Sequence, residues 1–168
     1  MSVPVGDRKE SKFEAITFSV ELHNMLIELM QRDFGIKDVD DFVRVQFAHG
    51  RIDKEDFSHY QYLMHQFKTE INRAALMLTS NVRAANSIYP SSQLPKEIAI
   101  SEWEKRRQYQ DYAILNCETL INHLQRVIDV FKVDINKFER HVKAIDREIG
   151  LIKKWRQRDN KIKSYLQG

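Results

Sequence analysis

Apolar residues recur every three or four positions along most of this chain, which is the spacing of one face of an α-helix. Four long stretches share this spacing, and they predict helices at about residues 12–34, 54–87, 98–131 and 135–164. The second stretch is the most regular, with apolar residues at Phe57, Tyr60, Met64, Phe67, Ile71, Ala74, Leu78, Val82 and Ala85. Long amphipathic helices with short connections are typical of a four-helix bundle. We therefore predict an all-α fold in which residues 1–168 form a single antiparallel four-helix-bundle domain.

The other three stretches supply the remaining core positions. The stripe of the first stretch consists of Phe13, Ile16, Val20, His23, Ile27, Met30 and Phe34. That of the third consists of Ala113, Cys117, Leu120, Leu124, Val127 and Phe131, and that of the fourth of Phe138, Val142, Ile145, Ile149 and Ile152. Each stripe predicts which face of its helix packs into the bundle.

Short polar motifs predict where the helices begin and end. Ser11 with Glu14, and Ser101 with Glu104, have the spacing of a capping box, in which each side chain bonds a free backbone amide of the other residue. Gly35 is expected to end the first helix, because glycine adopts the left-handed conformation at the least cost.

Two breaks separate the later helices, at residues 89–92 and 132–134. The first break contains Pro90, and the residue before a proline avoids helical angles. Residues 36–52 form an extra segment between the first two helices, which we interpret as a short helix or loop. Asp53 is then a candidate cap for the second helix.

The composition is that of a helical intracellular protein. Of the 168 residues, 42% are hydrophobic and 30% are charged, as in globular proteins. Only 5 glycines and 3 prolines occur, which is too few for the turns of a many-stranded sheet. The single cysteine, Cys117, excludes an internal disulfide and suits a reducing cytoplasm. The N-terminus lacks a signal-peptide core and no apolar run could cross a bilayer, so we expect a soluble cytoplasmic protein with no membrane association.

No pattern in the sequence points to catalysis, so we expect neither enzymatic activity nor a cofactor. There is no glycine-rich phosphate loop and no nucleophile poised beside a base. A di-iron bundle needs two Glu-x-x-His pairs, and the nearest match is Asp56 with His59. His59 and His65 lie six positions apart and face different directions, which does not suit a metal site. We interpret His23 and Cys117 as core residues.

Positive charge gathers toward the C-terminal end of the chain. Residues 1–84 carry a net charge of −2, from 11 Lys and Arg against 13 Asp and Glu, and residues 85–168 carry +5, from 16 against 11. In the window 151–163, Asp159 is the only acid beside six cations, which are Lys153, Lys154, Arg156, Arg158, Lys161 and Lys163. A basic end on a nearly neutral body suggests a polyanion or an acidic protein surface as the partner.

Six cations of the fourth predicted helix share one face. At about 100° per residue they fall within an arc of about 60°, roughly opposite the apolar stripe. They are Arg140, Lys143, Arg147, Lys154, Arg158 and Lys161. Solvated faces usually mix signs, because opposite charges three or four residues apart stabilise a helix and like charges destabilise it. No acid lies within this arc, which favours the binding of an anionic partner over a merely solvated face.

Three more residues border the basic face. Trp155 lies between the apolar and basic faces, and could be a lid on the core, a platform for a stacked base or an anchor in a protein contact. Arg106 and Arg107 stand near the start of the third helix. If the third and fourth helices are antiparallel, both arginines come close to the end of the fourth and extend the basic patch.

Three segments resemble a known family of small four-helix-bundle proteins. They are SNVRAANSIYP at 80–90, EWEKRRQYQDYAILNCETL at 102–120 and IDREIGLIKKWRQRDNK at 145–161, and the part from Glu148 to Arg156 is the most specific. The family includes the accessory variability determinant of diversity-generating retroelements and proteins encoded in intervening sequences of large-subunit ribosomal RNA genes.

The resemblance implies a homo-oligomer, specifically a pentameric barrel, without catalytic activity of its own. It implies binding to the reverse transcriptase of the retroelement and to its RNA or RNA/DNA, in support of error-prone copying. The candidate contacts are then Arg83, Arg106, Arg107, Arg140, Lys143, Arg147, Lys153, Lys154, Trp155, Arg156, Arg158 and Lys161. Residues 36–52 look like an insertion relative to the shorter members of the family.

Two classes of function stay open at this point. The leading hypothesis is an accessory protein that binds RNA and a reverse transcriptase. The alternative is a structural, oligomeric scaffold whose basic face binds an acidic protein. Both include self-association, because apolar residues beside the stripes of the second and third helices exceed what a monomer is expected to cover. These residues are Tyr62, Leu63, Ile114, Ile121 and Ile128.

Overall fold

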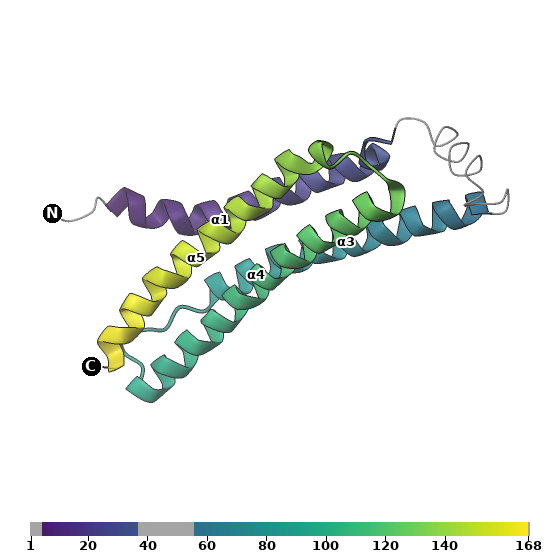
Figure 1. Ribbon diagram of the computed structural model, residues 1–168. Coiled ribbons are helices and arrows are strands. Elements are labelled where there is room, and N and C mark those ends of the chain that lie inside the picture. Colours follow the sequence, from purple (N-terminus) through teal and green to yellow (C-terminus); the bar gives the residue numbers. More distant parts are fainter. Residues whose placement is uncertain (1–4, 37–55, 168) are drawn as a thin grey trace.

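Four long helices make up nearly all of the structure, a computed structural model that describes residues 5–36 and 56–167, with side chains described at 14–36 and 60–164. The long helices are α1 (Val5–Gln31), α3 (Asp56–Ser87), α4 (Lys96–Phe131) and α5 (Glu139–Gln167) (Figure 1). Two short 3₁₀ turns, η1 (Asp33–Gly35) and η2 (Ile135–Phe138), follow α1 and precede α5. No strand occurs in the described residues.

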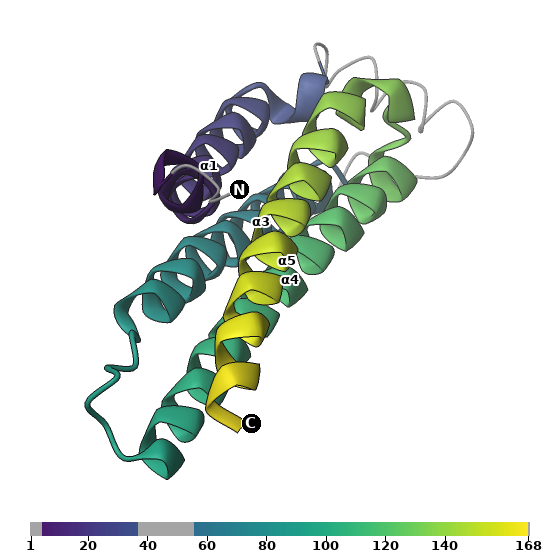
Figure 2. The ribbon, with the colours of Figure 1, turned by 90° about the vertical axis from the view of Figure 1, so that its left-hand side faces the viewer.

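The helices run alternately up and down and form an antiparallel four-helix bundle, as predicted. Going round the bundle, α1 packs on α3, α3 on α4, α4 on α5, and α5 back on α1 (Figures 1 and 2). Consequently α3 and α5 lie diagonally opposite each other. The predicted extra segment lies, apart from Ile36, outside the described residues, as does the predicted cap Asp53.

The core runs along the axis of the bundle and consists mainly of aliphatic side chains. The largest fully buried ones include Leu22, Leu26, Ile71, Leu78, Leu120, Leu124, Ile145 and Ile152. Full burial of one such side chain contributes about 1.5–3 kcal/mol relative to exposure. At one end Phe34 and Phe138 close the core in an edge-to-face contact, with ring centroids 6.3 Å apart. The stripes predicted for the second, third and fourth helices point into this core where side chains are described.

The stripe predicted for the first helix is displaced by about 100° around the helix, the angle between neighbouring residues, although its last members, Met30 and Phe34, are buried as predicted. Phe18, Leu22 and Leu26 are buried, whereas Val20 is 37% exposed and Ile16 only partly buried. This helix has apolar residues on both faces, so periodicity could not choose between them. The choice depends on the positions of α3 and α5, which bracket α1 in the bundle.

Both predicted capping boxes are wrong. Helix α1 begins at Val5, before Ser11, and α4 begins at Lys96 after Pro95, so that Ser101 lies inside the helix. Proline has no amide hydrogen to bond and fixes a backbone angle suited to a helix start. Pro95 occupies the N-cap position, and no side-chain cap hydrogen bond forms there.

The predicted helix ends agree better with the structure. Helix α3 ends at Ser87, two residues before Tyr89, as the following proline requires. Lys132 caps α4 in the left-handed conformation, and the Asp134 side chain accepts a hydrogen bond from the Asn136 amide to start η2. Gly35 has a φ of +81° and closes η1, four residues after α1 itself ends.

Candidate nucleic-acid interface

The C-terminal half of α5 presents cations on its outer surface because its apolar stripe and its only acid both face inward. Figures 1 and 2 show α1 and α5 diverging toward the C-terminus, where α5 runs beside α4. Lys154, Arg158 and Lys161 are exposed, and Asp159 is buried. We call these three cations the cationic face. The inward turn of Asp159 removes the one carboxylate that could have neutralised it from within the segment 151–163.

Two of the three cations of the cationic face have no local counter-charge in the described part of the chain. Lys154 and Lys161 form no ion pair with any residue that the structure describes. Lys153 is also exposed and unpaired within the same described part, but lies one step of about 100° around the helix, outside the face. Three cations within two turns repel one another, so an anion that contacts all of them is stabilised by relief of that repulsion.

The N-terminal half of the predicted basic arc differs from this end. Lys143 pairs with Glu139 at 2.8 Å, and this bond holds the pKa of the Glu139 carboxyl below its usual value. Arg147 lies over the Phe18 ring, 4.3 Å from its centroid, with Glu14 at 4.0 Å. The six cations therefore do not form one continuous uncompensated patch.

Arg106 is not a surface residue, and its predicted contact with RNA is wrong. It is 2% exposed and donates two hydrogen bonds to the Asp159 carboxylate, from Nε to Oδ2 at 2.7 Å and from Nη2 to Oδ1 at 3.1 Å. Nη1 donates to the carbonyl oxygen of Ile88 at 2.9 Å, and Gln110 donates to Asp159 Oδ2 at 2.7 Å. The arginine thus connects α4, α5 and the end of α3.

Trp155 is part of the core, which decides among its three predicted roles. It is 2% exposed, and the Arg106 guanidinium lies 5.0 Å from its ring centroid and 5.2 Å from that of Trp103. A buried ring cannot stack on a base, so Trp155 is a lid over this end of the core. The exposed aromatic residue near this buried cluster is Tyr89, which is 71% exposed and contacts Trp103 edge-to-face.

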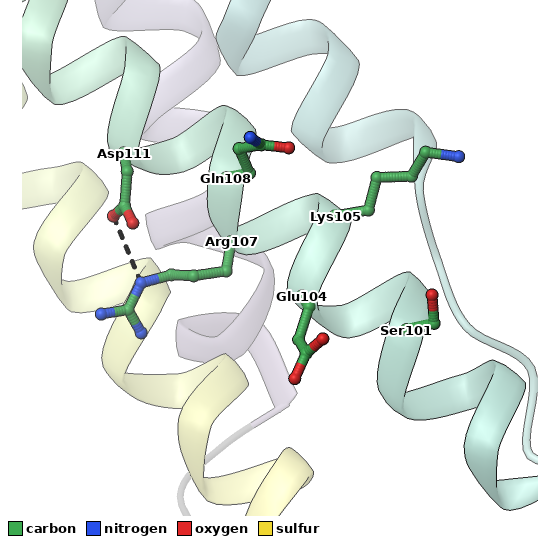
Figure 3. A pocket seen from close by; sticks show the side chains of 6 residues that line it. All are labelled: Ser101, Glu104, Lys105, Arg107, Gln108 and Asp111. Carbon is green, nitrogen blue, oxygen red and sulfur yellow. Dashed lines mark hydrogen bonds and ion pairs between the residues drawn. The ribbon is translucent and has the colours of Figure 1, made fainter.

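Arg107 and Arg156 are compensated by residues of the bundle. Arg156 Nη1 donates to Asp111 Oδ1 at 2.7 Å, and Arg107 donates to Asp111 at 3.2 Å and to Asn160 at 2.7 Å. Figure 3 shows the shallow groove on α4, in which Arg107 turns toward Asp111 while Glu104 and Lys105 also line the wall. This groove mixes charges of both signs. The two arginines therefore connect α4 to α5 instead of extending the cationic face.

Arg83 is exposed, but it belongs to a different part of the surface. It lies on α3, which is diagonal to α5 in the bundle. The predicted set of twelve site residues is therefore divided. Lys154, Arg158 and Lys161 share one outer face, Trp155 and Arg106 are internal, and the other members are paired or lie elsewhere.

Two buried acids were not predicted, Glu148 and Asp159, and both lie at helical spacing from residues of the apolar stripe of α5. Glu148 is fully buried, and neither of its carboxylate oxygens has a hydrogen-bond partner among the described residues. Burial raises its pKa to about 8, although the nearby Arg147 opposes the shift. Glu148 lies between Ile145 and Ile152, and Asp159 follows Ile152 by seven residues. Heptad spacing from a core position was the signal that could have found them.

The metal-ligating side chains are dispersed among the described residues. These residues contain no group of three or more His, Cys, Asp or Glu that could hold a metal ion. His23 forms a hydrogen bond with Asn72 at 2.8 Å, and Cys117 is buried, with its thiol pKa raised by burial and by Glu148. In the same part of the chain, no helix has the length and apolar character needed to span a membrane.

Comparisons with protein-family models, with curated proteins and with solved structures give no significant match. The family resemblance of the three segments therefore stays a prediction. The geometry of the cationic face is independent of that resemblance, since it follows from the positions of α4 and α5 alone.

Proposed function

We propose that this protein is a non-enzymatic accessory factor that binds RNA through the cationic face of α5. The observation that carries the proposal is the burial of Asp159 against Arg106, beside a face on which Lys154, Arg158 and Lys161 are exposed and Lys154 and Lys161 form no ion pair with any described residue. Lysine and arginine on one helix face bind a phosphate backbone by releasing its counterions. Such contacts position nucleic acid without reading its sequence.

We propose further that the RNA belongs to a diversity-generating retroelement, with its reverse transcriptase as the protein partner. The proposal relies on the resemblance of residues 80–90, 102–120 and 145–161 to that family. In the fold these three segments come together at one end, where Ile88, Arg106 and Asp159 are joined by hydrogen bonds. A shared end is what a common binding function of the three segments would require. A neighbouring reverse-transcriptase gene with paired template and variable repeats would support this assignment.

The test replaces Lys154, Arg158 and Lys161 together by Gln and measures RNA binding over a series of salt concentrations. For each phosphate that the variant no longer neutralises, the slope of log affinity against log salt should become shallower by about 0.7–0.9. We expect weaker binding, a flatter slope and an unchanged helical content, because exposed substitutions seldom change stability by more than about 0.5 kcal/mol each.

A matched control removes the same charge elsewhere. Arg73, Lys105 and Arg126 are exposed, and each pairs with an acid three residues away on its own helix. Their triple replacement by Gln should leave affinity and slope close to those of the unchanged protein. Equal weakening in the two triple variants would mean that net charge alone drives binding. Unchanged binding in the first variant would favour the scaffold alternative, in which the face meets an acidic protein.

We also propose that the protein self-associates through the outer faces of α3 and α4, with five subunits as the resemblance implies. The predicted reason was partly wrong: Tyr62 is exposed as predicted, but Ile114 is buried and the remaining members, Leu63, Ile121 and Ile128, pack against the monomer core. Other apolar residues are exposed instead, namely Leu76 and Met77 on α3 and Tyr112 and Leu115 on α4. Exposed apolar side chains on neighbouring helices are typical of protein interfaces.

A further inference from the structure

A partly enclosed cavity of about 300 Å³ lies at the other end of α5, between the last turns of α1, η1, η2 and the first turn of α5. Its inner wall is apolar and contains Met25, Leu29 and Phe34, of which Leu29 and Phe34 are buried. A volume of this size is at the lower end of the range for small-molecule sites. It is large enough for one aromatic ring with a small substituent.

The outer wall of the cavity carries positive charge. Arg32, Lys137 and Arg140 line it, and among the described residues Glu28 supplies the one carboxylate of the lining. Glu28 lies 3.7 Å from Arg32, and both side chains are mostly exposed, so the pair is weak. The Lys137 ammonium donates to the carbonyl oxygen of Gly35, which is neutral, and Lys137 forms no ion pair with any described residue. The lining therefore carries a net charge of about +2 on an apolar floor, an arrangement that favours anions.

A neutral hydrogen-bonding group completes the lining. His141 is half-buried, and burial together with Arg140 and Arg32 lowers the pKa of its imidazole. The lowered pKa favours the uncharged ring at neutral pH, and its Nδ1 atom is buried without a hydrogen-bond partner among the described residues. An anion bound in the cavity would reverse the local field and favour protonation of the ring.

The backbone beside the cavity adopts an unusual conformation. Asp33, Phe34 and Gly35 have φ angles of 48°, 58° and 81°, in the left-handed region. A bulky aromatic residue rarely adopts this region and does so at a cost in free energy. Burial of Phe34, the ion pair between Lys68 and Asp33, and the bond from Lys137 hold the turn in place. Backbone strain of this kind is most often retained at binding sites.

We propose that this cavity binds a small organic anion, with a carboxylate or phosphate between Arg32, Lys137 and Arg140 and an apolar or aromatic body on Met25, Leu29 and Phe34. The site is separate from the cationic face, because Arg140 precedes Lys154 by 14 residues, or about 21 Å along the helix. The proposal is therefore independent of RNA binding and would stand if that function were disproved.

Calorimetry on the full chain with four probes tests the ligand class. Phenyl phosphate and benzoate carry both an anion and a ring, inorganic phosphate carries only the anion, and benzyl alcohol carries only the ring. We expect at least one aryl anion to bind at least tenfold more tightly than either inorganic phosphate or the alcohol. The stronger of the two identifies phosphate or carboxylate as the natural group. The proposal is overturned if neither aryl anion binds at millimolar concentration, or if benzyl alcohol binds equally well.

Paired variants test the location. Arg32→Gln with Arg140→Gln should weaken binding of the preferred aryl anion at least tenfold. Arg73→Gln with Arg126→Gln removes the same charge from α3 and α4, outside the cavity lining, and should leave it unchanged. Equal weakening in both pairs would show that net charge alone attracts the probe, which contradicts a built site.

The pH dependence gives a second measurement on the unchanged protein. The charged groups that line the cavity around His141 are Glu28 and Arg32 on α1, Lys137 on η2 and Arg140 on α5. Because a bound anion favours the imidazolium form, affinity for benzoate, whose charge stays constant over this range, should rise severalfold as pH falls from 7 to 5.5. The rise should be absent in His141→Phe. An identical pH profile in that variant would show that the anion does not bind beside His141.

Discussion

Glu148 illustrates how one buried side chain can determine the pH dependence of a small bundle. Its carboxyl group is fully buried on the core side of α5, near Cys117, and has a pKa raised to about 8. In the unfolded chain the group titrates near its ordinary value of 4.5. Between these two values the folded state binds one more proton than the unfolded state. Folding stability should therefore fall as pH rises from about 4.5 to about 8 and then level off.

Replacing Glu148 by Gln should remove this dependence. Between pH 5 and 7.5 the unchanged protein should lose up to about 1.4 kcal/mol of unfolding free energy per pH unit relative to Glu148→Gln, because the variant lacks the titrating carboxyl group. Urea denaturation at several pH values measures it. Parallel stability curves for the two proteins would contradict burial of the carboxyl group in its protonated form.

The buried pair of Arg106 and Asp159 should respond to mutation more strongly than any surface pair. Arg106→Met leaves the Asp159 carboxylate buried and uncompensated, for which we expect a decrease of about 3–5 kcal/mol in unfolding free energy. The control is Arg107→Gln, on the adjacent residue, whose exposed ion pair is worth about 1 kcal/mol or less. Adding Asp159→Leu to Arg106→Met should restore much of the stability. Equal effects of Arg106→Met and Arg107→Gln would contradict the buried geometry.

At the scale of the elements, the interior of helix α5 contains a residue with low helix propensity. Helix α5 contains Gly150 in its interior, where glycine is less favourable than alanine because the unfolded chain gains more conformational entropy. No atom outside the helix's own backbone and adjacent residues lies within 4 Å of where a Cβ would stand on Gly150. Helix α5 can therefore accept a side chain at this position.

Gly150→Ala should stabilise the protein by about 0.5–1 kcal/mol, seen as a higher midpoint in urea with an unchanged slope. Gly35→Ala is the matched comparison and should destabilise it, because Gly35 has a φ of +81° that alanine adopts only with strain. A destabilising effect at Gly150 would mean that some contact depends on the absence of a side chain there.

The whole molecule has apolar residues left on its surface after the bundle has formed. Leu76 and Leu115 are both more than half exposed, on adjacent helices α3 and α4. If this surface joins subunits, the unchanged protein should sediment as a closed oligomer. Leu76→Glu with Leu115→Glu should then sediment as a folded monomer with the same helical content. A monomer at high micromolar concentration for the unchanged protein would contradict self-association.

The sequence alone was enough to predict the four helices and their antiparallel packing. Apolar spacing along the chain reports helix periodicity directly, and the breaks at residues 89–92 and 132–134 depend on local backbone preferences. Where only one side of a helix is apolar, as in α3 and α5, the local sequence also predicts which side faces the core. In α1 both faces carry apolar residues, and the neighbouring helices decided that Leu22 and Leu26 are buried instead of Val20.

Tertiary structure alone decided which charges are available to a partner. Arg106 and Asp159 are 53 residues apart, and Arg156 and Asp111 are 45 apart, so only the packing of α4 on α5 brings them together. A cation that finds a carboxylate inside its own fold is less available to an external anion, because its charge is already compensated. The cavity between α1 and α5 likewise combines residues more than 100 positions apart. Local periodicity determined the helices, and long-range charge pairing determined the surfaces that they present.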